Sequence, residues 1–108
     1  MANTITYAPG KIHVVFDGAT IYNSTSVFPD GLRITGILFY PSAANDILEV
    51  RDGAAAATVI SKLISASGGV VKEYFINGQT YKPYIAVPAA GENVWGTAAN
   101  IRVIFEYD

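Results

Sequence analysis

The chain has 108 residues, of which 51% are hydrophobic and only 15% charged, and its formal net charge is −2. This length fits a single domain with one hydrophobic core. The seven Lys and Arg are scattered singly, which argues against a nucleic-acid or anionic-membrane partner, and the absence of cysteine excludes disulfides, cysteine-ligated zinc and thiol catalysis.

The N-terminal stretch MANTITYAPGK has no basic region followed by a continuous apolar run, so it does not read as a secretory signal peptide. No apolar run in the sequence approaches the roughly 20 residues that span a bilayer. We therefore expect synthesis in the cytoplasm and no membrane partner.

Turn residues recur at short, fairly even intervals along the chain. The segments between them are rich in Val, Ile, Thr, Tyr and Phe, a spacing typical of all-β domains. We predict one domain over residues 1–108, a jelly-roll-like β-sandwich or Greek-key barrel of roughly seven or eight antiparallel strands. The predicted turns are Pro9-Gly10, Asp17-Gly18, Pro29-Asp30-Gly31, Pro41-Ser42, Asp52-Gly53, Gly68-Gly69, Asn77-Gly78 and Gly91-Glu92-Asn93.

The segment KIHVVF is the first clear strand. Ile12, Val14 and Phe16 share one face, and His13 and Val15 share the other. Val15 is therefore an apolar residue on a face that should be exposed.

The segment GLRITGILFYP is the longest predicted strand. Its outer positions Arg33 and Thr35 give way after Gly36 to Ile37 and Phe39, so the strand turns apolar on both sides. A glycine inside a strand is typical of a bulge or bend. We expect Gly36 to let this strand pass from one sheet to the other.

The segment NDILEVRDG contains three acids that could form a site. In a strand, Asp46 and Asp52 lie at the two ends of the inward face, whereas Glu49 points outward, so the three do not converge. We interpret Asp46 and Asp52 as turn residues whose side chains bond nearby backbone. A calcium ion shared with Glu92 or Asn93 is the alternative.

Residues 54–65 fit two structures. Their apolar spacing suits a short helix, but the β-branched run TVI favours a strand, which we predict. Gly68-Gly69 and Asn77-Gly78 are expected to be hairpin connections.

The C-terminal segment alternates most clearly. Ile101, Val103, Phe105 and Tyr107 share one face, and Ile104 interrupts the polar face. Three strands thus carry apolar residues on a nominally exposed face.

These apolar outer positions and the low charge predict a homo-oligomer. Soluble domains usually carry about 25% charged residues, so an interface between subunits would explain the deficit. Cover by another part of the same chain, or a neutral surface of small polar residues, is the alternative. The predicted interface residues are Val15, Ile37, Phe39 and Ile104.

The motifs of common catalytic sites are missing from this sequence. His13 is the single histidine, and there is neither a G-x-S-x-G nucleophile turn nor a glycine-rich phosphate loop. We predict that the protein is not an enzyme, with no catalytic residues, no cofactor and no metal.

Aromatic residues near the turns offer a second functional hypothesis. Tyr81, Tyr84 and Trp95 could stack on a sugar ring, which would make the chain a carbohydrate- or other ligand-binding β-sandwich. We rank this alternative below self-association.

The stretches ILFYPSAANDILEVRDGAAA, YKPYIAV and AANIRVIFEYD together resemble small β-structured proteins encoded among the particle genes of tailed bacteriophages. The resemblance covers about half of the chain and consists of turn chemistry. It implies a structural protein located in the virion or the host cytoplasm, with other particle proteins as partners beside copies of itself.

Overall fold

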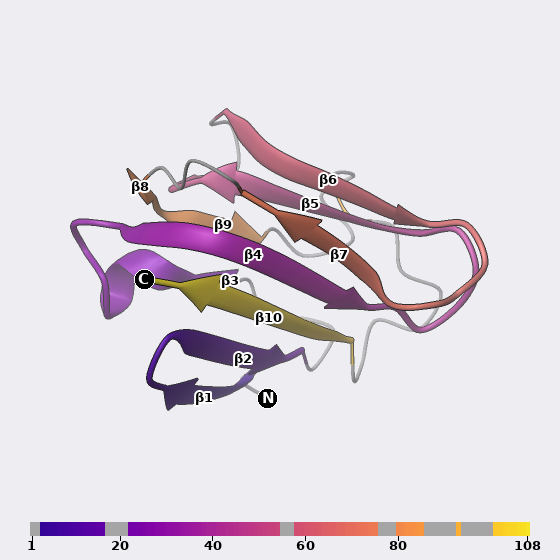
Figure 1. The fold of residues 1–108 in the computed structure, drawn as a ribbon, viewed down its shortest axis with the longest axis horizontal. Coiled ribbons are helices and arrows are strands. Elements are labelled where there is room, and N and C mark those ends of the chain that lie inside the picture. Colours follow the sequence, from indigo (N-terminus) through magenta and orange to yellow (C-terminus); the bar gives the residue numbers. More distant parts are fainter. Residues whose placement is uncertain (1–2, 17–21, 55–57, 76–79, 86–92, 94–100) are drawn as a thin grey trace.

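The computed structural model describes residues 3–16, 22–54, 58–75, 80–85, 93 and 101–108. In this part of the chain it contains ten β-strands and one short 3-10 turn, η1 (Ser24–Ser26). None of the residues described forms a helix that is long and apolar enough to cross a membrane. The strands are β1 (Thr4–Ala8), β2 (Lys11–Val15), β3 (Tyr22–Asn23), β4 (Leu32–Tyr40), β5 (Asp46–Asp52), β6 (Val59–Ser65), β7 (Val71–Tyr74), β8 (Thr80–Tyr81), β9 (Pro83–Ile85) and β10 (Arg102–Tyr107) (Figure 1).

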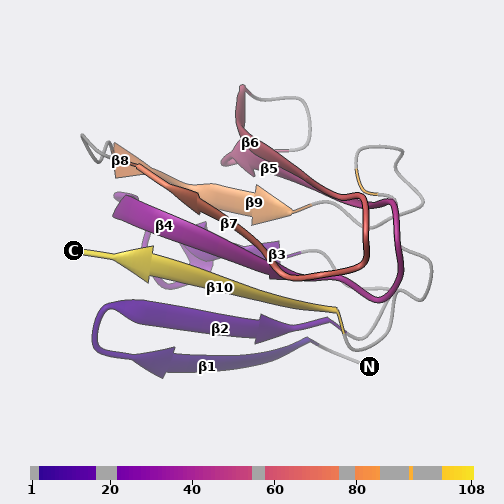
Figure 2. The ribbon, with the colours of Figure 1, turned by 45° about the vertical axis from the view of Figure 1, so that its right-hand side comes forward.

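The strands form two antiparallel sheets packed face to face. The larger, which we call sheet A, has the order β1-β2-β10-β4-β7, and β8 pairs with the first residues of β4. The smaller, sheet B, has the order β3-β9-β5-β6. Figure 2 shows β1 at the free border of sheet A and β6 at the opposite side of the molecule.

The chain folds back on itself as a ribbon of nested strand pairs. β5 pairs with β6 at the closed end of the ribbon, and outside this pair β4 pairs with β7, β3 with β9, and β2 with β10. The successive pairs belong alternately to sheet B and sheet A. This nesting is the jelly-roll topology, which confirms the predicted all-β, jelly-roll-like sandwich.

The structure has more strands than the sequence predicts. β1 joins sheet A outside the nested ribbon, as a hairpin with β2 across Pro9 and Gly10. After β7 the chain forms two short strands in place of one, because β8 pairs with β4 in sheet A and β9 pairs with β5 in sheet B.

The core fills the space between the sheets. Alternate residues of β2, β4 and β10 meet alternate residues of β5, β6 and β9, which is the pattern that a pleated strand requires. The buried cluster consists of Ile12, Val14, Phe16, Tyr22, Leu32, Ile34, Ile37, Phe39, Leu48, Val50, Leu63, Ile85, Ile101, Val103 and Phe105.

A bulge in β4 corrects two of the predicted interface residues. Glu106 of β10 lies opposite Gly36, but the next residue, Tyr107, lies opposite Ile34, so β4 has one extra residue at this point. The extra residue reverses the alternation of β4. Ile37 and Phe39 consequently face the core with no exposed surface, and their predicted outward placement is wrong.

The bulge at Gly36 is confirmed, although its predicted consequence is not. β4 pairs with β10 in sheet A on both sides of Gly36, so the strand does not pass between sheets. A Cβ at Gly36 would lie 2.8 Å from Oε1 of Glu106, at the far end of a flexible side chain, so a larger residue here would only require that side chain to move.

Two further predictions concern the middle of the chain. The strand prediction within residues 54–65 is confirmed by β6, which pairs along β5. The hairpin prediction for Gly68-Gly69 is wrong, because the strands on either side, β6 and β7, belong to different sheets. Asn77-Gly78 lies outside the described residues.

Candidate functional site

Asp46 holds the turn between β4 and β5. Its Oδ2 accepts hydrogen bonds from the amide of Ser42 at 2.7 Å, the hydroxyl of Ser42 at 2.6 Å and the amide of Ala43 at 3.0 Å. Asn45 beside it adopts a positive φ of 69°, a conformation that asparagine tolerates better than most residues. The interpretation of Asp46 as a turn residue is confirmed.

Asp52 also has a structural role, with a different partner from the one expected. Its Oδ1 accepts the backbone amide of Lys82 at 2.8 Å, and the amide of Gly53 donates to the Lys82 carbonyl at 2.7 Å. Asp52 therefore joins the end of β5 to the segment between β8 and β9, and it does not simply close its own turn.

Glu49 lies on the outer face of sheet B and is nevertheless buried, with 7% of its surface exposed. The Arg51 guanidinium donates to Glu49 Oε1 through Nε at 2.8 Å and through Nη2, and the Lys62 ammonium lies 4.0 Å from Oε2. The Glu49 amide donates to Asn93 Oδ1 at 2.8 Å. Two cations thus balance the Glu49 carboxylate, and Asn93 accepts the hydrogen bond of the Glu49 backbone amide.

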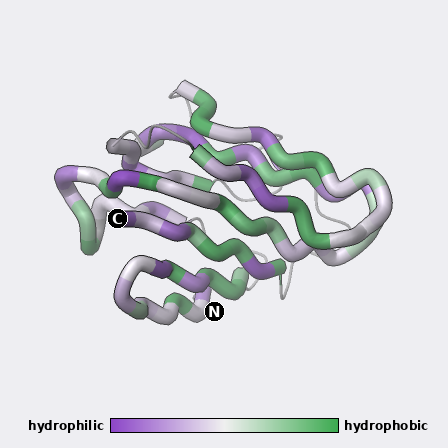
Figure 3. The backbone as a smooth tube through the Cα atoms, in the orientation of Figure 1, coloured by the Kyte–Doolittle hydropathy of each residue, from purple (hydrophilic) through white to green (hydrophobic). Residues whose placement is uncertain are grey.

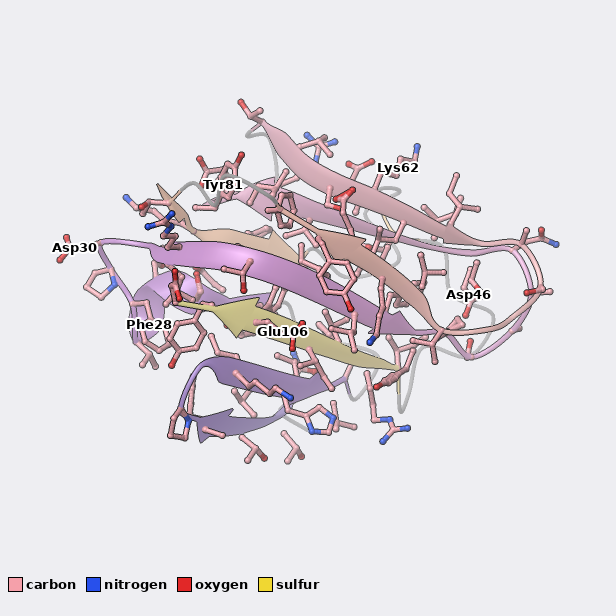
Figure 4. All side chains as sticks on the ribbon, viewed as in Figure 1. Phe28, Asp30, Asp46, Lys62, Tyr81 and Glu106 are labelled. Carbon is pink, nitrogen blue, oxygen red and sulfur yellow. The ribbon has the colours of Figure 1, made fainter. Side chains whose placement is uncertain are left out.

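The three acids of this segment lie apart, as the sequence analysis predicts. Asp46 sits at the turn end of β5, as Figure 4 shows, and Glu49 and Asp52 are bound to different partners. Among residues that the structure describes, no group of three or more His, Asp and Glu side chains could hold a metal ion. Glu92, part of the calcium alternative, lies outside those residues.

Two of the three aromatic residues of the ligand-binding hypothesis, Tyr81 and Tyr84, lie on different surfaces. Tyr81 packs at the edge of the core, with its ring centroid 6.2 Å from that of Phe75. Tyr84 lies opposite Arg51 and alternates with the buried Pro83 and Ile85, so it faces outward from sheet B. Trp95 lies outside the described residues.

The outer face of sheet A carries the most distinctive group of side chains. Ile104 lies at its centre, opposite His13 of β2 on one side and Leu38 of β4 on the other. Val15 occupies the same face and lies opposite Arg102. We call Val15, Leu38 and Ile104 the outer patch. Val15 and Ile104 are half-buried, whereas Leu38 keeps only 8% of its surface exposed. The roles of Val15 and Ile104 in an interface stay predictions.

Charged and aromatic side chains surround the outer patch. The Lys11 ammonium lies 3.9 Å from the Glu106 carboxylate at one end of the strands. The Arg102 guanidinium lies 4.8 Å from the ring centroid of Tyr40 at the other end. Figure 3 shows hydrophobic residues recurring along β2, β10 and β4 between hydrophilic ones, and they include the residues that face the core.

His13 adds an unusual polar feature to this face. Its Nε2 is buried and has no hydrogen-bond partner. Buried polar atoms in folded proteins are nearly always hydrogen-bonded, to protein or to ordered water. His13 Nε2 is therefore a buried polar atom, on the residue opposite Ile104, that no described residue hydrogen-bonds.

Leu38 is the member of the patch that the sequence analysis missed. In an unbroken strand, Leu38 would share the face of Leu32 and Ile34. The signal that identifies it is Gly36, since a bulge at that glycine moves Leu38 outward and Phe39 inward.

The edge strand β1 is the second notable surface. All five of its residues are exposed, and none carries a charge. Ile5 and Tyr7 face the side of the sheet that carries the core, yet they keep 37% and 45% of their surface exposed. The ring centroid of Tyr7 lies 6.0 Å from that of Phe28, which is labelled in Figure 4.

Comparison with known proteins adds no assignment. No protein-family model matches the chain, and no curated protein or solved structure gives a match. The fold and these two surfaces therefore carry the functional argument.

Proposed function

We propose that this protein is a non-catalytic structural protein that assembles with copies of itself through the outer face of sheet A, as a component of a phage particle. The observation that carries the proposal is the outer patch, an apolar centre with charges at its border. Interfaces between proteins have this composition, with an apolar, charge-depleted centre and a polar rim.

Burial of the outer patch would stabilise the contact by about 25 cal/mol for each Å² removed from water, before the costs of association.

The particle association is supported by the sequence resemblance to phage particle proteins and by an analogy of fold. Jelly rolls occur in viral capsid domains, and they also occur in lectins and cupins, so the topology suits a particle protein without distinguishing it from other uses. The predicted partners are copies of the chain and other particle proteins.

The substitution Ile104→Lys tests the proposal. A lysine in the middle of the outer patch would extend to water in the monomer but would bury a charge in the interface. We expect light scattering behind a sizing column to show a mass well below that of the parent, with an unchanged far-UV circular dichroism spectrum.

Ile64→Lys is the matched control, because Ile64 is 55% exposed and lies on the outer face of sheet B, opposite Ile47. Its mass should equal that of the parent. If Ile104→Lys also keeps the parent mass, the outer patch is not an interface.

A further inference from the structure

The strands that border the two sheets in the described part of the chain are protected to different degrees, and one of them, β8, has only two residues. An unpaired edge exposes backbone amides and carbonyls that can pair with another chain, and proteins usually shorten, charge or cover such edges. β3 has two residues, β6 carries Lys62, and β7 carries Lys72 and Glu73. β7 is also linked to β6, because the Ser61 hydroxyl donates to the Glu73 carboxylate.

β1 has none of these protections. It is five residues long, β2 is its only partner among the described strands, and its sequence TITYA contains neither a charged residue nor a proline. Alternate residues of β1 must turn their amides and carbonyls away from β2, because an antiparallel strand bonds each neighbour through alternate residues. The outer border of β1 therefore carries backbone amides and carbonyls that no described strand pairs with.

The side chains of β1 fit the same conclusion. Ile5 and Tyr7 remain exposed although they point to the core side of sheet A. Val27, next to the Tyr7 partner Phe28, is 50% exposed. A strand added beside β1 would extend the sheet and cover apolar surface that the monomer leaves in water.

We infer that the occupant of this edge is β1 of a second copy of the chain, paired antiparallel about a two-fold axis at Thr6. Full pairing of Thr4–Ala8 with itself places Thr6 opposite Thr6, Thr4 opposite Ala8 and Ile5 opposite Tyr7. Pairs of a β-branched and an aromatic side chain are favourable across strands. The strand carries no charge, so the identical copies do not repel each other.

This inference deepens the proposed function and rests on it, because it names a second contact through which copies assemble. Edge pairing joins the two A sheets into one continuous sheet and leaves their outer faces free. The outer patch can then hold one such pair against another. The two contacts make separate predictions, since each can be broken without the other.

Single cysteines test the edge contact in an otherwise cysteine-free chain. In the proposed register, Thr6→Cys places two thiols directly opposite, with Cα atoms about 4.5–5.5 Å apart, which is within disulfide range. Thr4→Cys is the register control, because its thiols would lie four residues out of register, roughly 13 Å apart along the strands. We expect Thr6→Cys to form a disulfide-linked dimer under mild oxidation and Thr4→Cys alone to stay mostly uncrosslinked.

Mixing Thr4→Cys with Ala8→Cys should restore the crosslink, because these positions face each other in the proposed pair. Ile5→Lys should lower the solution mass by placing a charge at the paired edge, and Ile64→Lys again serves as its control. The double variant Ile5→Lys, Ile104→Lys should have the mass of a single chain, 11.5 kDa.

The outcomes separate the two proposals. If the parent is a monomer, the proposed function and the edge inference both fail. If Ile104→Lys lowers the mass but Ile5→Lys does not, and Thr6→Cys crosslinks no better than Thr4→Cys, the edge inference is wrong while the outer-patch contact stands. Crosslinking at Thr6 together with a lower mass for Ile5→Lys supports the edge pair.

Discussion

The two faces of sheet A carry similar side chains but differ in what covers them. On the inner face, Phe39 lies opposite Val103, and both have no exposed surface because sheet B packs against them. On the outer face, Ile104 and Val15 remain half-buried. The contrast shows that an apolar residue in a strand does not by itself identify the face that packs in the core.

The largest expected effect is on the inner face. Phe39→Ala should lower the free energy of unfolding by about 3–5 kcal/mol, because it removes a buried ring and leaves a cavity between the sheets. Chemical denaturation followed by circular dichroism would measure the loss. Ile104→Ala is the comparison on the outer face and should cost less in a monomeric background, so equal losses would break the distinction between the two faces.

The substitution Asp46→Ala tests the turn at the start of β5, in sheet B at the end of the core. It removes a carboxylate oxygen that accepts three hydrogen bonds from Ser42 and Ala43. Hydrogen bonds to charged groups each contribute more than neutral ones, so we expect a loss of about 2–3 kcal/mol in the same denaturation assay.

Asp52→Ala provides the control for this loss. Asp52 is exposed and accepts a hydrogen bond from the backbone amide of Lys82, so its removal should cost less than about 1 kcal/mol. A larger loss at Asp52 than at Asp46 would contradict the role assigned to the first turn.

The smallest predicted effect is a pH dependence of the stability that arises from a tyrosine in the core between the sheets. Burial, and to a lesser extent repulsion by Tyr7, raises the pKa of the Tyr22 hydroxyl, which has no hydrogen-bond partner. The unfolded chain ionises this tyrosine near pH 10, whereas the folded chain retains the proton. Stability is therefore unaffected below pH 10 and should fall as the pH rises above it.

Tyr22→Phe should remove part of this alkaline loss. The ring stacks on Phe105, with centroids 5.6 Å apart, and phenylalanine can keep that contact. Removal of a buried, unsatisfied hydroxyl should also raise stability at neutral pH by about 1 kcal/mol. Thermal unfolding between pH 7 and 11 would test both, and an identical alkaline slope for parent and variant would contradict this account of Tyr22.

Much of the fold could be predicted from alternation and turn residues. The faces of β2 and β10 follow directly from residues that alternate along regular strands, as at Ile12 and Val103. Gly36 gave the position of the bulge in β4. The side of the bulge on which Ile37 and Phe39 lie could not be derived, because one inserted residue reverses the face of everything after it.

The nesting of the strands was also beyond the sequence. Alternation defines the two faces of a strand but does not identify its neighbours, so β6 and β7 could have formed a hairpin across Gly68-Gly69. Their placement in different sheets depends on pairings between distant segments, such as Gly36 with Tyr74. Only part of the outer patch could be predicted. Val15 and Ile104 lie on regular strands, so alternation gives their face, whereas Leu38 follows the bulge, which reverses the face.

The most direct test of self-assembly is the solution mass of the parent chain, measured by light scattering behind a sizing column at low and high salt. We predict a single multiple of 11.5 kDa that persists at high salt, because apolar burial and backbone pairing are not weakened by screening. A monomer at both salt concentrations, with the protein well above micromolar concentration, would contradict the account.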